Sequence, residues 1–217
     1  MDSYRRHEMF EMQVLNHLNS GRILSDLVFG GGTMLRLCHG LDRYSVDLDF
    51  YLREKITGGQ IEEKMMPILN AVYDITDHKM KANTLILEIR SPRYPRRLKI
   101  EINIRRNIGV SEPEIAWSPF SDLQVLTETV PLDIMMEMKC EALINRREIR
   151  DAYDIEFLIR KGISLTEDSE KRHRIKDIIL NFTSRDFKVK LGSILEPDKR
   201  DFYIQKGFRL LLDQIWE

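Results

Sequence analysis

The segment that decides the fold spans residues 30–50 and reads GGGTMLRLCHGLDRYSVDLDF. The apolar run 24–29 before it predicts a short buried strand. The three glycines interrupt regular structure, and Thr33 is expected to cap a helix that ends at Gly40. Residues 45–52 alternate between apolar and polar side chains, which predicts a second strand. The segment therefore has the order strand, glycine turn, helix, strand.

The glycine turn has the properties of an anion-binding site. Glycines let the backbone approach a ligand closely, and the N–H groups and dipole at a helix N-terminus favour negative charge. We therefore expect Gly31, Gly32 and Thr33 to hold phosphate groups. The turn is neither a Walker A loop nor a GxGxxG fingerprint, so on its own it indicates an anion site and nothing narrower.

The strand at 45–52 carries Asp47 and Asp49 on its polar face. Residues i and i+2 of a strand point the same way with Cα atoms about 6.5 Å apart, and two like charges there repel unless a cation lies between them. Carboxylates are the ligands that Mg²⁺ prefers, and two-metal phosphoryl chemistry needs several of them. The alternative is a solvated sheet face with scattered acidic residues. If Asp47 and Asp49 were the only evidence, this alternative would be the better explanation.

A third carboxylate lies on the alternating segment 98–104, LKIEINI. Its apolar side chains share one face, and Lys99, Glu101 and Asn103 share the other. If this strand pairs with the aspartate strand, with both polar faces on the same side, Glu101 joins Asp47 and Asp49. The predicted catalytic and metal-binding set is therefore Asp47, Asp49 and Glu101.

Hydrophobic periodicity predicts the other elements. They are helices over 8–19 and 62–72, paired strands over 85–89 and 98–104, and a loop around 113–119. From Pro131 onward the pattern is almost wholly helical. We therefore expect an α+β protein with a mixed α/β half at 1–115 and a helical half at 120–217.

Composition narrows the class of protein. The net charge of −1 over 217 residues does not itself indicate nucleic-acid binding. The sequence lacks an apolar run long enough for a membrane span and the apolar core of a signal peptide, so a cytoplasmic protein is expected. Cys38 and Cys140 have no CxxC spacing, which disfavours a zinc site.

A local basic cluster surrounds the predicted hairpin. Its members are Arg90, Arg93, Arg96, Arg97, Lys99, Arg105 and Arg106. Such a cluster could guide the phosphates of an RNA acceptor, and Tyr94 could stack on a base. The alternative is a solvated hairpin tip.

The glycine turn and the acidic strand resemble the signature of polymerase-β-type nucleotidyltransferases. More narrowly, they are similar to the AbiEii/AbiGii toxin family, in which a GGT…R-x-S-x-D-L-D-F run is characteristic. The matching residues are Gly31–Thr33, Arg43, Ser45 and Asp47–Phe50. Downstream, KCEALINR at 139–146 and RDAYDIEFL at 150–158 resemble the K-x-x-A-L…R-D-x-x-D-x-x-x-L helices of that family.

The resemblance implies a polymerase-β-type core, a small mixed sheet with flanking helices, followed by a helical half that completes a cleft. It also implies residue roles. Metal ions would be bound by Asp47, Asp49 and Glu101, and the nucleotide by Gly31, Gly32, Thr33, Ser45, Lys139 and Asp154, with Asp151 as an alternative to Asp154. The third acid of the family is usually Asp, whereas position 101 is Glu, whose carboxylate is one methylene further out.

The resemblance further implies a transfer of NMP from an NTP to an acceptor hydroxyl, dependent on Mg²⁺ or Mn²⁺. The acceptor would be the 3′ end of tRNA or a protein, and the protein would be the toxin of a toxin–antitoxin or phage-defence pair with a cognate antitoxin. Two alternatives remain open. One is a non-catalytic nucleotide- or RNA-binding module, which Glu101 favours, and the other is a small-molecule nucleotidyltransferase.

The downstream residues also have structural interpretations. Lys139 could be a surface lysine whose stem lies along apolar neighbours. Arg147 with Asp151, and Arg150 with Asp154, have the i,i+4 spacing of ion pairs that only stabilise a helix, by about 0.3–0.5 kcal/mol.

Overall fold

A computed structural model describes residues 2–53 and 56–216 of the chain. It divides into two compact units. The first comprises Met1–Gly40 and Tyr44–Pro131, and the second comprises Leu41–Arg43 and Leu132–Glu217. The short segment Leu41–Arg43 thus belongs with the C-terminal helices, although it lies in the middle of the sequence motif.

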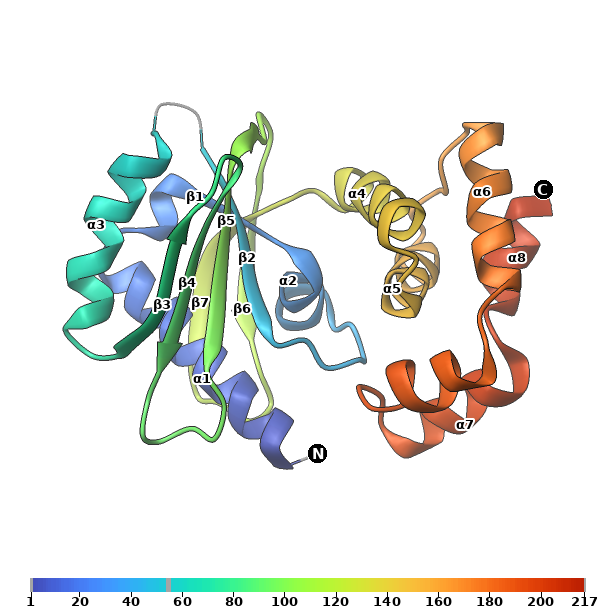
Figure 1. The fold of residues 1–217 in the computed structure, drawn as a ribbon, viewed down its shortest axis with the longest axis horizontal. Helices are drawn as coiled ribbons and strands as arrows, with labels where there is room; N and C mark the ends of the chain where they lie inside the picture. The colour runs from blue at the N-terminus through green and yellow to red at the C-terminus, as the bar shows by residue number, and fades with distance from the viewer. Residues whose placement is uncertain (1, 54–55, 217) are drawn as a thin grey trace. The chain divides into compact units, whose positions relative to one another are not determined.

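The first unit contains a mixed sheet of seven strands (Figure 1). The strands are β1 (Leu27–Gly30), β2 (Asp47–Leu52), β3 (Asp74–Met80), β4 (Thr84–Arg90), β5 (Leu98–Asn107), β6 (Glu112–Trp117) and β7 (Gln124–Thr129). Their order across the sheet is β3-β4-β5-β2-β1-β7-β6. The pairs β1–β7 and β2–β5 are parallel and the other pairs are antiparallel. The predicted mixed sheet is confirmed.

The helices of this unit are α1 (Asp2–Ser20), α2 (Gly31–His39) and α3 (Gly58–Asn70), with a short 3-10 turn at Leu24–Asp26. The helix α1 contacts α3 and β7, whereas α2 contacts β1, β2 and β6. The core contains alternate residues of the central strands, such as Leu48 and Phe50, together with Phe10 and Leu15 of α1. Each such buried side chain contributes about 1.5–3 kcal/mol to stability.

Two local predictions at the start of the motif were wrong. The helix α2 begins at Gly31, so Thr33 is its third residue and does not cap it. Gly31 has a φ of 73°, which lets the chain turn from β1 directly into the helix. Leu24–Asp26 forms the 3-10 turn, so the strand that was expected from Leu24 begins only at Leu27.

The segment predicted as a loop around 113–119 instead contains β6, which pairs with β7. Pro113 had suggested a loop, but β6 is the edge strand of the sheet, where a proline without an N–H group is tolerated. The first unit therefore continues to Pro131, beyond the boundary expected at 115–120.

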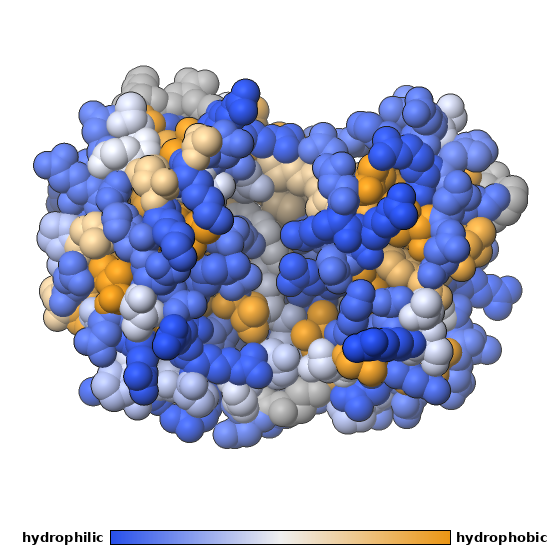
Figure 2. Space-filling model, viewed as in Figure 1, coloured by the Kyte–Doolittle hydropathy of each residue, from blue (hydrophilic) through white to orange (hydrophobic). Residues whose placement is uncertain are grey.

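The second unit is built from helices. They are α4 (Leu132–Arg146), α5 (Ile149–Arg160), α6 (Ser169–Leu180), the π-helical turn Asp186–Leu191, α7 (Pro197–Lys206) and α8 (Arg209–Trp216). Tyr153, Tyr203 and Phe208 are buried and their rings pack together. Figure 2 shows that hydrophilic residues dominate the face in view. Within residues 2–53 and 56–216, no helix is both long and apolar enough to cross a membrane.

Candidate active site

The two aspartates of the motif lie in the middle of the sheet. β2 is flanked by β1 and β5, and its residues alternate between buried and half-buried. Leu48 and Phe50 point into the core, while Asp47 and Asp49 point to the other side. The predicted separation of the two faces is therefore present.

The strand that carries Glu101 pairs with β2 in the predicted way. In the parallel β2–β5 pair, Asp49 lies opposite Glu101 and Asp47 lies opposite Lys99. Residues opposite one another in paired strands share a face of the sheet. Lys99 and Glu101 therefore lie on the same face as the two aspartates.

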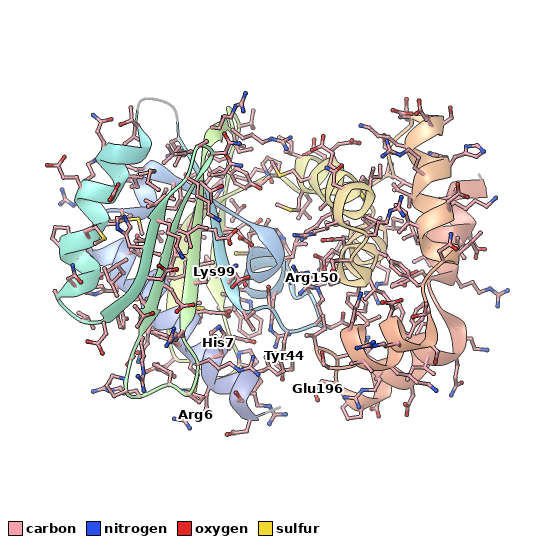
Figure 3. All side chains as sticks on the ribbon, viewed as in Figure 1. Arg6, His7, Tyr44, Lys99, Arg150 and Glu196 are labelled. Carbon is pink, nitrogen blue, oxygen red and sulfur yellow. The ribbon has the colours of Figure 1, made fainter. Side chains whose placement is uncertain are left out.

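Lys99 lies between two of the carboxylates. Its Nζ atom is 2.7 Å from Oε1 of Glu101 and 3.4 Å from Oδ2 of Asp47. Partial burial lowers the pKa of Lys99, but its hydrogen bond with Glu101 and the charge of Asp47 outweigh this and raise it above the ordinary value. Figure 3 labels Lys99 among the side chains on the sheet. The sequence motif had assigned it no role at this site.

The N-terminus of α2 packs directly against Asp49. A Cβ atom on Gly31 would lie 2.1 Å from Oδ2 of Asp49, so only glycine leaves room for this carboxylate. The N–H groups in the first turn of a helix have no acceptor within the helix. Those of Gly31, Gly32 and Thr33 are thus positioned beside the acidic strand, where they can bind an anion.

The Thr33 side chain connects α2 to β2. Its hydroxyl donates a hydrogen bond to the backbone oxygen of Asp47 at 2.6 Å, and the side chain is fully buried. The hydroxyl hydrogen that was expected to serve a phosphate therefore holds the acidic strand in place. Ser45 lies half-buried two residues before β2.

The downstream motif segments, residues 139–146 and 150–158, contribute to a buried ionic network in the second unit. Asp154 is fully buried and accepts two hydrogen bonds from Arg43, at 2.6 and 2.7 Å. Lys139 Nζ lies 2.7 Å from the same carboxylate and 3.8 Å from Asp151. Burial raises the pKa of Asp154, but the charges of Arg43 and Lys139 prevail and lower it to about 2.

The i,i+4 ion pairs expected in these segments are replaced by other contacts. Asp151 accepts two hydrogen bonds from Arg146, at 2.7 and 2.6 Å, and Asp154 pairs with Arg43 and Lys139. The helix is interrupted between α4 and α5, where Arg147 has a φ of 53°. Lys139 is only 7% exposed, which excludes its interpretation as a surface lysine.

Arg43 is the member of this network to which the sequence gave no role. The one signal was its place in the R-x-S part of the motif, and its partner Asp154 lies 111 residues away. The segment Leu41–Arg43 carries it into the second unit, where Arg43 also pairs with Leu195 in an isolated bridge.

The comparisons with known proteins agree with these features. The sequence profile described as the nucleotidyl transferase AbiEii toxin of a type IV toxin–antitoxin system matches residues 13–212. The chain belongs to the AbiEii family. It is therefore a nucleotidyltransferase of a toxin family, as the resemblance of its motifs implied, and the match extends beyond these motifs on both sides.

Solved structures show that the AbiEii chain shares its fold with other proteins. The structure of JHP933 from Helicobacter pylori is 19% identical, with 94% of each chain covered and a TM-score of 0.55. Another H. pylori structure, provisionally described as a nucleotidyltransferase, has the same identity and TM-score, with 94% of this chain and 96% of that one covered. None of the curated proteins matches the AbiEii chain.

The AbiEii family implies an NTP substrate and a divalent metal ion, and the residues on β2 fit such an ion. Asp47 and Asp49 offer hard oxygen ligands on one face, and the ammonium of Lys99 lies 3.4 Å from the Asp47 carboxylate. In the described part of the chain, no three His, Cys, Asp or Glu side chains are grouped closely enough to hold one ion. Glu101 lies on the same face, and its carboxylate pairs with Lys99.

Replacing Gly31 with Ala is expected to reduce nucleotidyl transfer by about 100-fold. The new Cβ would displace the Asp49 carboxylate, and a shift of about 1 Å in a catalytic group can cost that much. Transfer rates of the two proteins would be compared at saturating NTP. Gly59→Ala is the control, because a Cβ there meets no described atom within 4 Å. Equal rates for Gly31→Ala and Gly59→Ala would contradict the assigned role of Gly31.

Proposed function

We propose that this AbiEii-family enzyme moves NMP from an NTP to an acceptor hydroxyl in the presence of Mg²⁺ or Mn²⁺. It would act as the toxin of a type IV pair with a cognate antitoxin. The observation that carries the proposal is the position of Asp47 and Asp49 on one face of β2, against the N-terminus of α2. This arrangement supports the proposal, because carboxylate oxygens, which would bind a cation, lie beside backbone N–H groups, which would bind a triphosphate.

The residues of the first unit have separate tasks in this proposal. Asp47 and Asp49 hold the divalent ion, and the backbone N–H groups of Gly31–Thr33 bind the triphosphate. A bound ion supplies charge stabilisation and lowers the pKa of the attacking hydroxyl. The acceptor hydroxyl would lose its proton to water, its oxygen would form a bond to the α-phosphorus as the α–β phosphoanhydride bond breaks, and pyrophosphate would leave with the electron pair.

Three further residues complete the proposed nucleotide-binding set. Lys139 would contact nucleotide phosphates, and Asp154 would hold Lys139 in place from within the second unit, as their distance of 2.7 Å supports. Ser45 would bind the nucleotide from the segment that leads into β2. The assignments of Ser45, Lys139 and Asp154 rest on the motif that these residues share with the family.

The acceptor would be the 3′ end of tRNA or a protein hydroxyl. The purified chain would be incubated with each of the four α-labelled NTPs, Mg²⁺ or Mn²⁺, and either total tRNA or total protein. We expect transfer from at least one NTP onto one of these acceptors. Label removed by 3′ exonuclease identifies tRNA, and label removed by protease identifies a protein.

A non-catalytic nucleotide-binding module is the second candidate function. The pairing of Lys99 with Asp47 and Glu101 favours it, because two of the three acids already have a cationic partner. Nucleotide binding without transfer, under either metal and with either acceptor, would support this module and overturn the enzyme. Transfer onto aminoglycosides or other small hydroxyl compounds alone would indicate a small-molecule nucleotidyltransferase.

A further inference from the structure

Lys99 is built into the acidic face of the sheet. It lies opposite Asp47 in the parallel β2–β5 register and two residues before Glu101 on the same strand. Both neighbours therefore point to the same side as Lys99. The ammonium contacts both carboxylates from the middle of a seven-stranded sheet, between strands that are themselves flanked on either side.

A comparison within the same sheet shows that this is more than a surface ion pair. Lys79 on the edge strand β3 pairs with Asp77 at 2.7 Å, but the two side chains are 59% and 41% exposed. The Lys99 and Asp47 side chains are 37% and 29% exposed, and Lys99 binds two acids where Lys79 binds one. Water screens the contacts of Lys99 less.

The position of this ammonium limits where divalent ions can bind. A metal ion shared by Asp47 and Glu101 would have to lie where the Nζ atom of Lys99 contacts both carboxylates. Two cations cannot share that space, and their charges repel strongly at such a separation. The Asp49 carboxylate lies against Gly31 at the N-terminus of α2, on the side of β2 away from β5.

We propose that Lys99 replaces the second metal ion, so that the site binds one divalent ion, at Asp47 and Asp49, and not two. This inference rests on the proposed function, since it presupposes that the aspartates bind a metal. Lys99 is then a positioning residue that holds Glu101 and neutralises part of the acidic face. Glu101 serves as the partner of Lys99 and not as a direct ligand.

The test is a count of Mn²⁺ ions bound per chain, measured by electron paramagnetic resonance of free Mn²⁺ during titration of the full chain. We expect one ion for the natural protein and two for Lys99→Met, in which Asp47 and Glu101 lose the ammonium between them. Lys99→Arg keeps the positive charge and should still bind one. Lys79→Met is the matched control from β3 and should also bind one.

The melting temperature is a second measurement, which still tests the inference if the Lys99→Met variant folds poorly. Mn²⁺ should raise the melting temperature of Lys99→Met more than that of the natural protein, because a ligand that binds only the folded state stabilises it by mass action. Two ions on the natural protein, or one ion and an equal melting shift for Lys99→Met, would overturn the inference while the proposed function stands. No ion on any variant would contradict the proposed function, and this inference with it.

Discussion

Replacing Asp49 with Asn is expected to lower the rate of nucleotidyl transfer about 1000-fold. Asparagine has the same size, so the packing against Gly31 is kept, but the negative charge that binds the metal ion is lost. A bound metal contributes several kcal/mol of transition-state stabilisation, and each tenfold in rate corresponds to about 1.4 kcal/mol. Single-turnover transfer from labelled NTP would measure the loss.

The stability of the Asp49 variant distinguishes a catalytic role from a structural one. Asp49 lies beside Asp47 and opposite Glu101, so removing its charge relieves repulsion in the metal-free protein. We therefore expect a melting temperature equal to or above that of the natural protein. Asp77→Asn on β3 is the control, with unchanged transfer. A rate for Asp49→Asn within tenfold of the natural one would show that Asp49 holds no essential metal.

Replacing Asp154 with Asn is expected to destabilise the second unit by about 3–5 kcal/mol. The variant leaves Arg43 and Lys139 buried without the charge that compensates them, which is the costly way to break a buried ion pair. Chemical denaturation followed by circular dichroism would measure the change. Asp177→Asn, an exposed carboxylate on α6, is the control and should change stability by less than about 0.5 kcal/mol.

Acid unfolding provides a second measurement on the same residue. The pKa of Asp154 is lowered to about 2 in the folded chain, from 3.8 for a free aspartate. A depressed folded-state pKa adds stability above the unfolded pKa, and this stability is lost as the pH falls from about 4 to 2. The natural protein should lose stability over this window and Asp154→Asn should lose less. Parallel curves for the two proteins would contradict the buried ion pair.

The sequence predicted which side chains of the acidic strands share a face because the alternation of these strands is strict. The side chains of 98–104 alternate without a break, so Glu101 was expected to join Asp47 and Asp49 if the two strands pair, whereas the register that sets Asp49 opposite Glu101 comes from the structure. β6 could not be predicted in the same way, because Pro113 has the same local signal in a loop and in an edge strand.

The contacts of the charged side chains could not be predicted from the sequence. Position 99 was recognised as polar and on the face of Glu101, but its pairing with two acids depends on the three-dimensional register. The pair of Arg43 with Asp154 joins residues 111 positions apart, and nothing in local spacing indicates such a contact. The family motif contains both Arg43 and Asp154 but does not indicate that their side chains form an ion pair.

A crystal structure with Mn²⁺ and a non-hydrolysable NTP would test the proposed metal and triphosphate site directly. We expect an anomalous Mn²⁺ peak at about 2.0–2.2 Å from carboxylate oxygens of Asp47 and Asp49, with the triphosphate at the backbone N–H groups of Gly31–Thr33. An Mn²⁺ peak away from both aspartates, or a triphosphate bound away from the N-terminus of α2, would contradict the proposed site.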